Sequence, residues 1–325
     1  HGGWKKPVPD PYAKAVGING LRAQIIDLAA TNPPGWENDR IENLPAFLYP
    51  TDAVIYETHI RDFSMHSGSG MQHAGKYLSL TETDTRNESG SKTGLSYLKS
   101  LGITHLHLLP CNDIGSIDER NPTYNWGYDP LHYFALEGSY ATDPYEPATR
   151  IREFKSMVQA IHQQGIRIVM DVVFNHTYYT EKSLFEQLAP GQYYRFEADG
   201  SFADGSSCGN EIASEQPRVR QLLLDCLLFW VNEYHIDGFR FDLMGVHDIA
   251  TMNLIAAELR RIKPDILLYG EGWTAGASPL PDNMRALKAN AARLNHIAVF
   301  SDDIRDGIKG SVFDIKDKGF ASGKA

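Results

Sequence analysis

The chain has 325 residues, of which 42% are hydrophobic and 22% charged, and its formal net charge at pH 7 is −10. This composition is typical of a globular protein able to bury a large core. The negative charge argues against a nucleic-acid partner, because proteins that bind phosphate backbones present a basic face. No run approaches the ~18 apolar residues that a membrane span needs. We therefore expect no nucleic-acid partner and no membrane span.

The three cysteines Cys111, Cys208 and Cys226 form no CxxC pair and show no metal-ligand spacing. An odd number without a framework predicts free thiols, so disulfides are not expected to stabilise the fold. Extracellular, cell-surface and cytoplasmic locations all stay compatible with this pattern.

Residues 1–50 are rich in Pro, Gly and Asn and show little periodicity. Such a stretch is typical of a lead-in from a preceding domain. The regular pattern begins after it, so we place the main domain at residues 51–325.

Strand and helix signals then alternate along the chain. Short β-branched or apolar runs predict strands, and longer runs with helical spacing, often ended by Gly or Pro, predict helices. The expected strands are 54–60, 103–110, 166–174, 236–244, 266–273 and 296–302; the expected helices are 93–102, 151–165, 220–235 and 249–264, and 284–295 is a further connecting segment.

This alternation indicates an α/β fold with a parallel sheet, because a parallel crossover needs a connecting element on the sheet face. Both an open doubly wound sheet and a (β/α) barrel satisfy it. About six strand–helix units are present, whereas a closed TIM-type (β/α)8 barrel has eight. Long insertions at 111–148 and 175–215 follow the second and third strands, where both architectures build their sites. No GxGxxG follows a strand, so a dinucleotide site has no support.

Three carboxylates fall near the ends of successive apolar strands: Asp171 in VMDVVFNH, Asp242 in GFRFDLMG and Glu271 in LLYGEGW. A buried carboxylate is costly unless it is paired or functional. Because the carboxyl ends of parallel strands share one rim, the three side chains should converge there.

Arg240 lies two residues before Asp242, so both side chains point to the same face of the strand. The arginine favours the charged form of that aspartate, as a nucleophile requires. Glu271 lies between two glycines and near Trp273, in drier surroundings that favour a protonated acid. Two carboxyl groups in opposed environments match the needs of a glycosidase. The plain alternative, an Arg240–Asp242 ion pair inside the sheet with no catalytic role, is equally compatible with this pair alone.

Four motifs together carry a family likeness. DVVFNH, GFRFDLMG and LYGEGW resemble, in order and spacing, three of the four short regions shared by the α-amylase superfamily of glycoside hydrolases. YNWGYDP resembles the signature of the type I pullulanases, and VPDPYAKA, CGNEIASE and FSDDIRDGIKG are also similar to pullulanase sequences. The likeness implies an incomplete TIM-type barrel and a retaining hydrolase. Its implied substrates are the α-1,6-glucosidic branch linkages of pullulan, starch or glycogen.

The resemblance also implies residue roles. Asp242 would be the nucleophile, with Arg240 orienting it, and Glu271 the general acid/base. A retaining mechanism places the two carboxyl groups about 5 Å apart. Tyr128 would stack against the sugar at subsite −1, and Trp273 would form an aromatic wall on the leaving-group side. The remaining implied substrate-site residues are Trp126, Asp129, Asp171, Asn175 and His176.

The chain departs from the family pattern in its fourth region, a His-Asp pair that should supply a second aspartate near the seventh strand. His247-Asp248 lies just after the nucleophile strand and opens a helix, and neither Asp302 nor Asp303 follows a histidine. We therefore expect the chain to be part of a longer enzyme, ending before the last two strands.

Other interpretations stay open. A different superfamily member, such as an α-1,4-glucan hydrolase, an isoamylase-like enzyme or a branching enzyme, would share most of these motifs. A non-catalytic glucan-binding barrel would be expected to have lost Asp242 or Glu271, yet both are present. The resemblance implies no required cofactor. Some relatives hold a structural Ca²⁺ through oxygen ligands, and Asn175 lies where α-amylases place one of these; the sequence assigns no other ligand.

The missing aspartate and strands lead to a first prediction. The 325 residues alone should turn over pullulan slowly or not at all, because a catalytic carboxylate and part of the pocket are absent. Release of reducing sugar from pullulan by the isolated chain measures this. Rates comparable with those of complete pullulanases would refute it.

Overall fold

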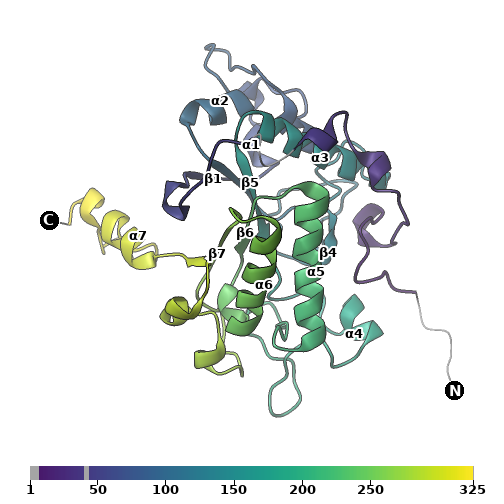
Figure 1. The fold of residues 1–325 in the computed structure, drawn as a ribbon, viewed down its shortest axis with the longest axis vertical. Helices are drawn as coiled ribbons and strands as arrows, with labels where there is room; N and C mark the ends of the chain where they lie inside the picture. The colour runs from purple at the N-terminus through teal and green to yellow at the C-terminus, as the bar shows by residue number, and fades with distance from the viewer. Residues whose placement is uncertain (1–6, 40–43, 325) are drawn as a thin grey trace.

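The computed structural model describes residues 7–39 and 44–324. Six parallel strands form one sheet in the order β1-β2-β5-β6-β7-β8, which curls into half of a TIM-type barrel (Figure 1). The strands are β1 (Ile55–Thr58), β2 (His105–Leu108), β5 (Arg167–Val172), β6 (Gly238–Phe241), β7 (Leu267–Gly270) and β8 (Ala298–Val299). A separate antiparallel hairpin consists of β3 (Asn112–Ile114) and β4 (Pro130–Leu136).

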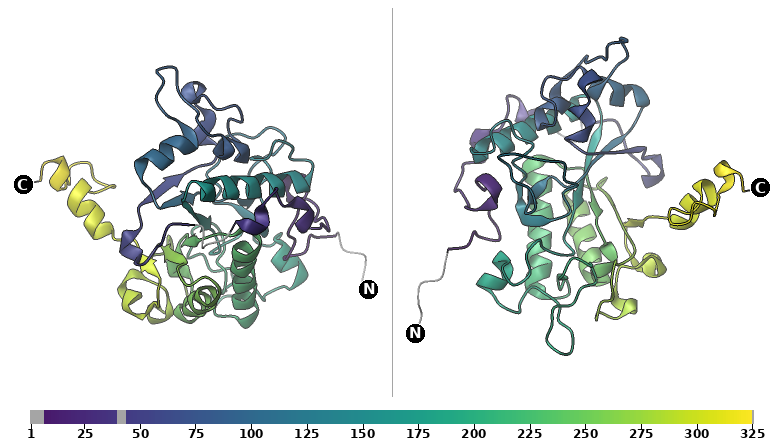
Figure 2. Two further views of the ribbon diagram at one scale, coloured as in Figure 1. Left: turned by 45° about the horizontal axis from the view of Figure 1, so that its top comes forward. Right: turned by 180° about the vertical axis from the view of Figure 1, so that it is seen from behind.

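Helices cover the outer face of the sheet, as the views from other sides show (Figure 2). The long ones bury apolar stripes against the strands: Trp230, Tyr234 and Phe154 are among the largest fully buried side chains. The α-helices are α1 (Asp62–Met65), α2 (Gly94–Leu101), α3 (Pro147–Gln163), α4 (Leu184–Leu188), α5 (Pro217–Tyr234), α6 (Ile249–Ile262) and α7 (Asp302–Lys309).

Each strand predicted from the sequence is present, and the four predicted helices are too. Residues 284–295, the further connecting segment, contain short 3-10 turns at Asp282–Met284 and Lys288–Arg293 rather than an α-helix. The β3–β4 hairpin lies inside the 111–148 insertion and was not predicted, because three residues of β3 are too few to show a period. Asp248 begins α6 as expected: its carboxylate accepts from the backbone of Thr251 at 2.9 Å.

The segment before the sheet packs against α3. Lys155 of that helix donates to the carbonyl of Leu28 at 3.0 Å and to the hydroxyl of Thr31 at 3.1 Å. Trp36 is buried and belongs to the same hydrophobic core as the helices. In the described part of residues 1–50, the chain therefore contributes to the domain; its link to a preceding domain stays a prediction.

The sheet has two edge strands, β1 and β8, each hydrogen-bonded to a single neighbour. Beyond β8, helix α7 projects away from the rest of the molecule (Figure 1). The residues that follow it are strongly exposed, with Phe313 at 93% and Ile315 at 94%. Among the described helices, none combines the length and apolar character needed to cross a bilayer.

A buried network of charged side chains lies at the amino ends of the strands, on the rim opposite Asp242 and Glu271. His162 donates to Asp237 at 2.8 Å from Nε2 and to Asp39 at 2.9 Å from Nδ1, while Lys263 also pairs with Asp237. Burial alone would lower the pKa of His162, but the two carboxylates outweigh it and raise that pKa to about 9. An imidazole that uses both nitrogens as donors is charged.

This network makes stability depend on pH. A histidine whose folded pKa is raised stabilises the fold fully below its ordinary pKa of 6.5, and that stability is lost as pH rises to about 9. We expect the free energy of unfolding to fall by about 3 kcal/mol over this window. His162→Gln should be less stable at pH 6 and should lose much less between pH 6.5 and 9. Urea unfolding of both proteins at several pH values measures this, and parallel curves would contradict it.

Candidate active site

One guanidinium connects the three carboxylates predicted to meet at the rim. Arg240 donates from Nη1 to Asp242 at 2.8 Å and to Asp171 at 3.0 Å, and from Nη2 to Glu271 at 2.7 Å. The residues come from the adjacent strands β5, β6 and β7, in parallel register with Asp171 opposite Arg240. Period-two alternation places Arg240 and Asp242 on one face, as the sequence predicted.

The shared donor also limits the separation of the two carboxyl groups. Asp242 and Glu271 each lie within 2.8 Å of a terminal nitrogen of the same planar group. They therefore face each other at one rim, well within the ~10 Å beyond which two carboxyl groups no longer suit a glycosidase. The separation of about 5 Å expected of a retaining pair stays a prediction.

Aromatic rings flank the guanidinium. Its central carbon lies 5.8 Å from the ring centroid of Tyr128 and 5.8 Å from that of Phe300. Phe300 directly follows β8, and its backbone N–H donates to Gly270 at 3.2 Å. Phe300 could not be predicted as a site residue from the sequence, because a single aromatic residue after a strand carries no signal of its own. The rings and carboxylates together leave Arg240 little freedom to move.

Asn175 holds the second oxygen of Asp242. Its amide nitrogen donates to the Asp242 carboxylate at 2.8 Å and to the Asp242 carbonyl at 3.0 Å, so its oxygen accepts from His176 Nδ1 at 2.6 Å. Both residues are buried. Burial lowers the pKa of His176, although a contact with the backbone of Tyr128 acts in the opposite direction. Nε2 makes no well-aligned hydrogen bond within the described residues. The pair thus links Asp242 to a polar atom suited to a sugar hydroxyl.

Glu271 is held by the backbone that follows the proposed nucleophile. The N–H of Leu243 donates to Glu271 at 2.9 Å, and Leu243 has φ of 39°, in the left-handed region that branched residues rarely adopt. This sharp turn aims the N–H at the carboxylate. Gly270 and Gly272 are required on either side: an added Cβ would lie 2.7 Å from the Phe241 carbonyl or 2.6 Å from the Lys288 nitrogen.

Asp171 joins the loop motif to the strands. Tyr128 donates its hydroxyl to Asp171 at 2.8 Å, and His107 of β2 lies 3.4 Å from the same oxygen. His107 was not among the predicted site residues, although its place in the alternating strand HLHL points it to the face that carries Asp171. The YNWGYDP motif therefore contacts the carboxylate cluster through Tyr128.

The other predicted residues lie farther from Arg240. Trp126 is 60% exposed and lines, with Tyr128, a groove of about 1000 Å³ beside the carboxyl end of β1. Asp129 accepts a hydrogen bond from Ser116 at 2.5 Å and makes no hydrogen bond to Arg240. Trp273 is tilted against Phe300 with ring centroids 6.4 Å apart. Trp126 and Trp273 thus have different neighbours, and Asp129 belongs to the loop that carries Tyr128.

The electrostatics of Asp242 differ from the simple expectation. Burial, followed by repulsion from Asp171, outweighs the attraction of Arg240 and raises the pKa of Asp242 to about 6. The arginine favours the charged form, as expected, but it is shared among three carboxylates. The pKa of Asp242, the candidate nucleophile, therefore lies only slightly below neutral pH, so its carboxyl group is mainly but not fully charged there.

Comparisons with known proteins find similar sequences and folds. The profile of the family described as "Alpha amylase, catalytic domain" matches residues 83–199. The chain is 48% identical over 324 residues to the pullulanase of Bacillus subtilis strain 168, covering 98% of this chain and 44% of that protein.

Solved structures show the same relationship. A pullulanase from Paenibacillus barengoltzii, crystallised with maltohexaose and α-cyclodextrin, has a TM-score of 0.93 at 51% identity over 97% of this chain and 49% of its own. Type I pullulanase from Bacillus subtilis, complexed with maltose, has a TM-score of 0.88 at 47% identity over 96% of this chain and 43% of its own.

The fold is that of the α-amylase catalytic domain, whose family model matches residues 83–199. Along nearly its whole length the chain is similar to pullulanases, in agreement with the resemblance that the YNWGYDP motif indicated. The chain spans less than half the length of the relatives described above.

The raised pKa of Asp242 predicts a stabilising substitution. An acid whose folded pKa lies near 6 rather than 3.8 destabilises the fold once it is charged, and this penalty fades as pH falls towards 4. Asp242→Asn should therefore increase the free energy of unfolding at pH 7 by up to about 3 kcal/mol. At pH 4 it should have little effect. Thermal unfolding from pH 4 to 8 measures this.

Asp199→Asn, in an exposed turn where Asp199 accepts from Ser201, is the matched control and should show no such gain at pH 7. A loss of stability in Asp242→Asn at neutral pH would mean that its hydrogen bonds to Arg240 and Asn175 outweigh the repulsion.

Proposed function

We propose that this chain carries the nucleophile and the general acid/base of a retaining hydrolase that cleaves α-1,6-glucosidic branch linkages in pullulan, starch or glycogen. The observation that carries the proposal is the single guanidinium of Arg240 holding Asp242 and Glu271 at one rim. The similarity to pullulanases along nearly the whole chain supports the choice of substrate class.

In the proposed reaction, Glu271 gives its proton to the glycosidic oxygen while a carboxylate oxygen of Asp242 attacks the anomeric carbon. The C–O bond to the leaving chain breaks, and a covalent β-glycosyl ester forms on Asp242. Glu271, now ionised, takes a proton from water, and the resulting hydroxide attacks the same carbon and releases Asp242. Two inversions return the α configuration.

The neighbouring residues supply binding and orientation. We propose that Tyr128 stacks against the sugar whose bond is cleaved and that His176 Nε2 accepts a hydrogen bond from one of its hydroxyls. Trp273, two residues after Glu271, lies near the ring of Phe300, and we propose that the two rings form an apolar wall against the leaving chain. Trp126, in the adjoining groove, provides a further ring for sugar contact.

Two carboxyl groups complete this hydrolysis without a cofactor, and we propose that none is required. The structural Ca²⁺ that some α-amylases place near the position of Asn175 fits this chain poorly. The amide oxygen of Asn175 already accepts from His176 at 2.6 Å, and its nitrogen is bonded to Asp242. To bind Ca²⁺ through this oxygen, Asn175 would have to give up its hydrogen bond with His176.

The test uses the full-length protein that contains this chain, with pullulan as substrate. Release of maltotriose is the expected outcome, and the first product formed should be the α anomer by NMR. Glu271→Gln should lower kcat by a factor of about 10² to 10⁴, because a general acid is lost. Asp242→Asn should abolish the glycosyl intermediate and turnover.

Asp199→Asn is the control and should retain full activity. Cleavage of α-1,4 linkages without maltotriose release would favour another member of the superfamily. Glucan binding without any hydrolysis would favour a non-catalytic barrel.

A further inference from the structure

A buried histidine joins the first strand of the sheet to the loop that carries Tyr128. His59 directly follows β1 at its carboxyl end, and only 7% of its surface is exposed. Its Nε2 lies 2.8 Å from the backbone carbonyl of Asn125, in the YNWGYDP motif, and its Nδ1 lies 3.2 Å from the backbone nitrogen of Asp62. These contacts are separate from the carboxylates that Arg240 holds.

The two backbone partners fix the proton on the ring. A backbone N–H can only donate, so Nδ1 of His59 accepts from Asp62 and carries no proton. A carbonyl can only accept, so Nε2 donates its proton to Asn125. The hydroxyl of Tyr140, 3.0 Å from Nε2, can share that proton. Burial lowers the pKa of His59, although the hydrogen bond to Asn125 acts in the opposite direction, which agrees with a neutral ring in one defined tautomer.

Asn125 extends this contact to the rest of the motif. While its carbonyl accepts from the histidine, its side-chain oxygen accepts from the backbone of Gly127 at 2.9 Å and its amide donates to Ser116 at 2.7 Å. Ser116 in turn donates to Asp129 at 2.5 Å. The two residues that flank Tyr128 are thus tied to Asn125, either directly or through one hydroxyl group.

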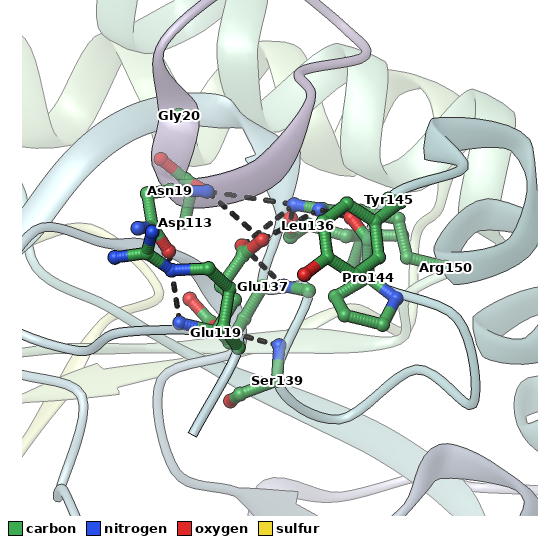
Figure 3. A network of polar contacts seen from close by, with 12 residues as sticks. Asn19, Gly20, Asp113, Glu119, Leu136, Glu137, Ser139, Pro144, Tyr145 and Arg150 are labelled. Atoms are coloured by element: carbon green, nitrogen blue, oxygen red, sulfur yellow. Dashed lines mark hydrogen bonds and ion pairs between the residues drawn. The ribbon is translucent and has the colours of Figure 1, made fainter. Parts of the chain in front are cut away.

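The insertion between β2 and α3, to which this motif belongs, is firmly held at its base. Arg150 of α3 donates to both carboxylate oxygens of Glu119, at 3.0 and 2.9 Å. Glu137, directly after β4, accepts from the backbone of Ser139 at 2.7 Å (Figure 3). All four residues are buried. This part of the insertion therefore has a rigid support that does not involve His59.

The tip of the same insertion has no comparable support. Residues 121–129 contain no helix or strand, and Trp126 is 60% exposed. Segments of this kind open at a low cost in free energy, because few buried contacts oppose the motion. The order of the tip therefore depends on individual anchors. The hydrogen bond from His59 is one of them, and the hydrogen bond from Tyr128 to Asp171 is another.

We propose that His59 is a positioning residue: its Nε2–H, fixed at the end of β1, holds Asn125 and thereby the turn that presents Tyr128 to the sugar. The part that Tyr128 plays here rests on the proposed function, whereas the hydrogen bonds do not. Without the anchor, the bound glucan would have to order the turn itself. Its apparent affinity would then fall in proportion to the fraction of molecules in which the turn is already formed. The loss should therefore affect KM more than kcat.

Two amide side chains separate the functions of the two ring nitrogens. In His59→Gln, the amide nitrogen can take the place of Nε2 and donate to the same carbonyl, whereas the shorter side chain of His59→Asn reaches only the place of Nδ1. His296→Asn is the matched control. His296 is exposed, lies two residues before β8 at the amino end of that strand, and has φ of 59°, a left-handed conformation that asparagine adopts readily. All three substitutions are made in the full-length protein that contains this chain.

Chymotrypsin reports the order of the turn independently of activity, since it cuts after exposed aromatic residues such as Tyr124 and Trp126. Loss of one hydrogen bond should make cleavage at these two positions about three- to tenfold faster in His59→Asn, while other sites are cut at the wild-type rate. KM for pullulan should rise by about the same factor, and kcat should change by less than about twofold. His59→Gln and His296→Asn should match the wild type in both measurements.

Unchanged cleavage of the turn in His59→Asn would overturn the proposal, as would acceleration of equal size along the whole chain, which indicates a general structural role. If His59→Asn does not fold, His59→Gln remains decisive, because faster cleavage of the turn in that variant contradicts the proposal. A wild type that releases no maltotriose from pullulan would disprove the proposed function. The proteolysis would then decide by itself whether His59 holds the turn.

Discussion

The arrangement of the candidate active site depends on the contacts of one guanidinium. Arg240 contacts carboxylates at the ends of its own strand and of both neighbouring strands. The register of β5, β6 and β7 therefore fixes the geometry of the site. A shift of one residue in β6 would turn Arg240 and Asp242 to the opposite face. The planar fork with fixed donors suits this role, which a lysine with its single charged nitrogen would not fill.

The loops add what the strands alone do not provide. The insertion after β2 brings Tyr128 to Asp171, and the loop after β5 brings Asn175 to Asp242, with His176 bonded to Asn175. Asp171 and Asp242, on which these loops converge, are both held by Arg240 as well. Distant parts of the chain therefore position the same carboxylates.

Much of the fold could be predicted from the sequence, because apolar strands and amphipathic helices have clear periods and the carboxylates stand at strand ends. The prediction was weaker where local pattern carries little information. The three residues of β3 are too few to show a period. For residues 284–295 the sequence predicted only a connecting segment and did not indicate its short 3-10 turns. Phe300 and His107 became visible as site neighbours only in three dimensions, since their contacts join strands far apart in sequence. The near-neutral pKa of Asp242 also required coordinates, because it depends on how many carboxylates share one arginine.

The two arms of that arginine have a consequence for the proposed reaction. Before glycosyl transfer the charge of the reacting pair lies on Asp242, beside Nη1; afterwards Asp242 is a neutral ester and Glu271, beside Nη2, carries it. The guanidinium thus faces the same total charge at both stages, and the negative charge crosses from one nitrogen to the other. A fixed cation that serves both states in turn needs no rearrangement between them, which keeps the reorganisation energy of the step small.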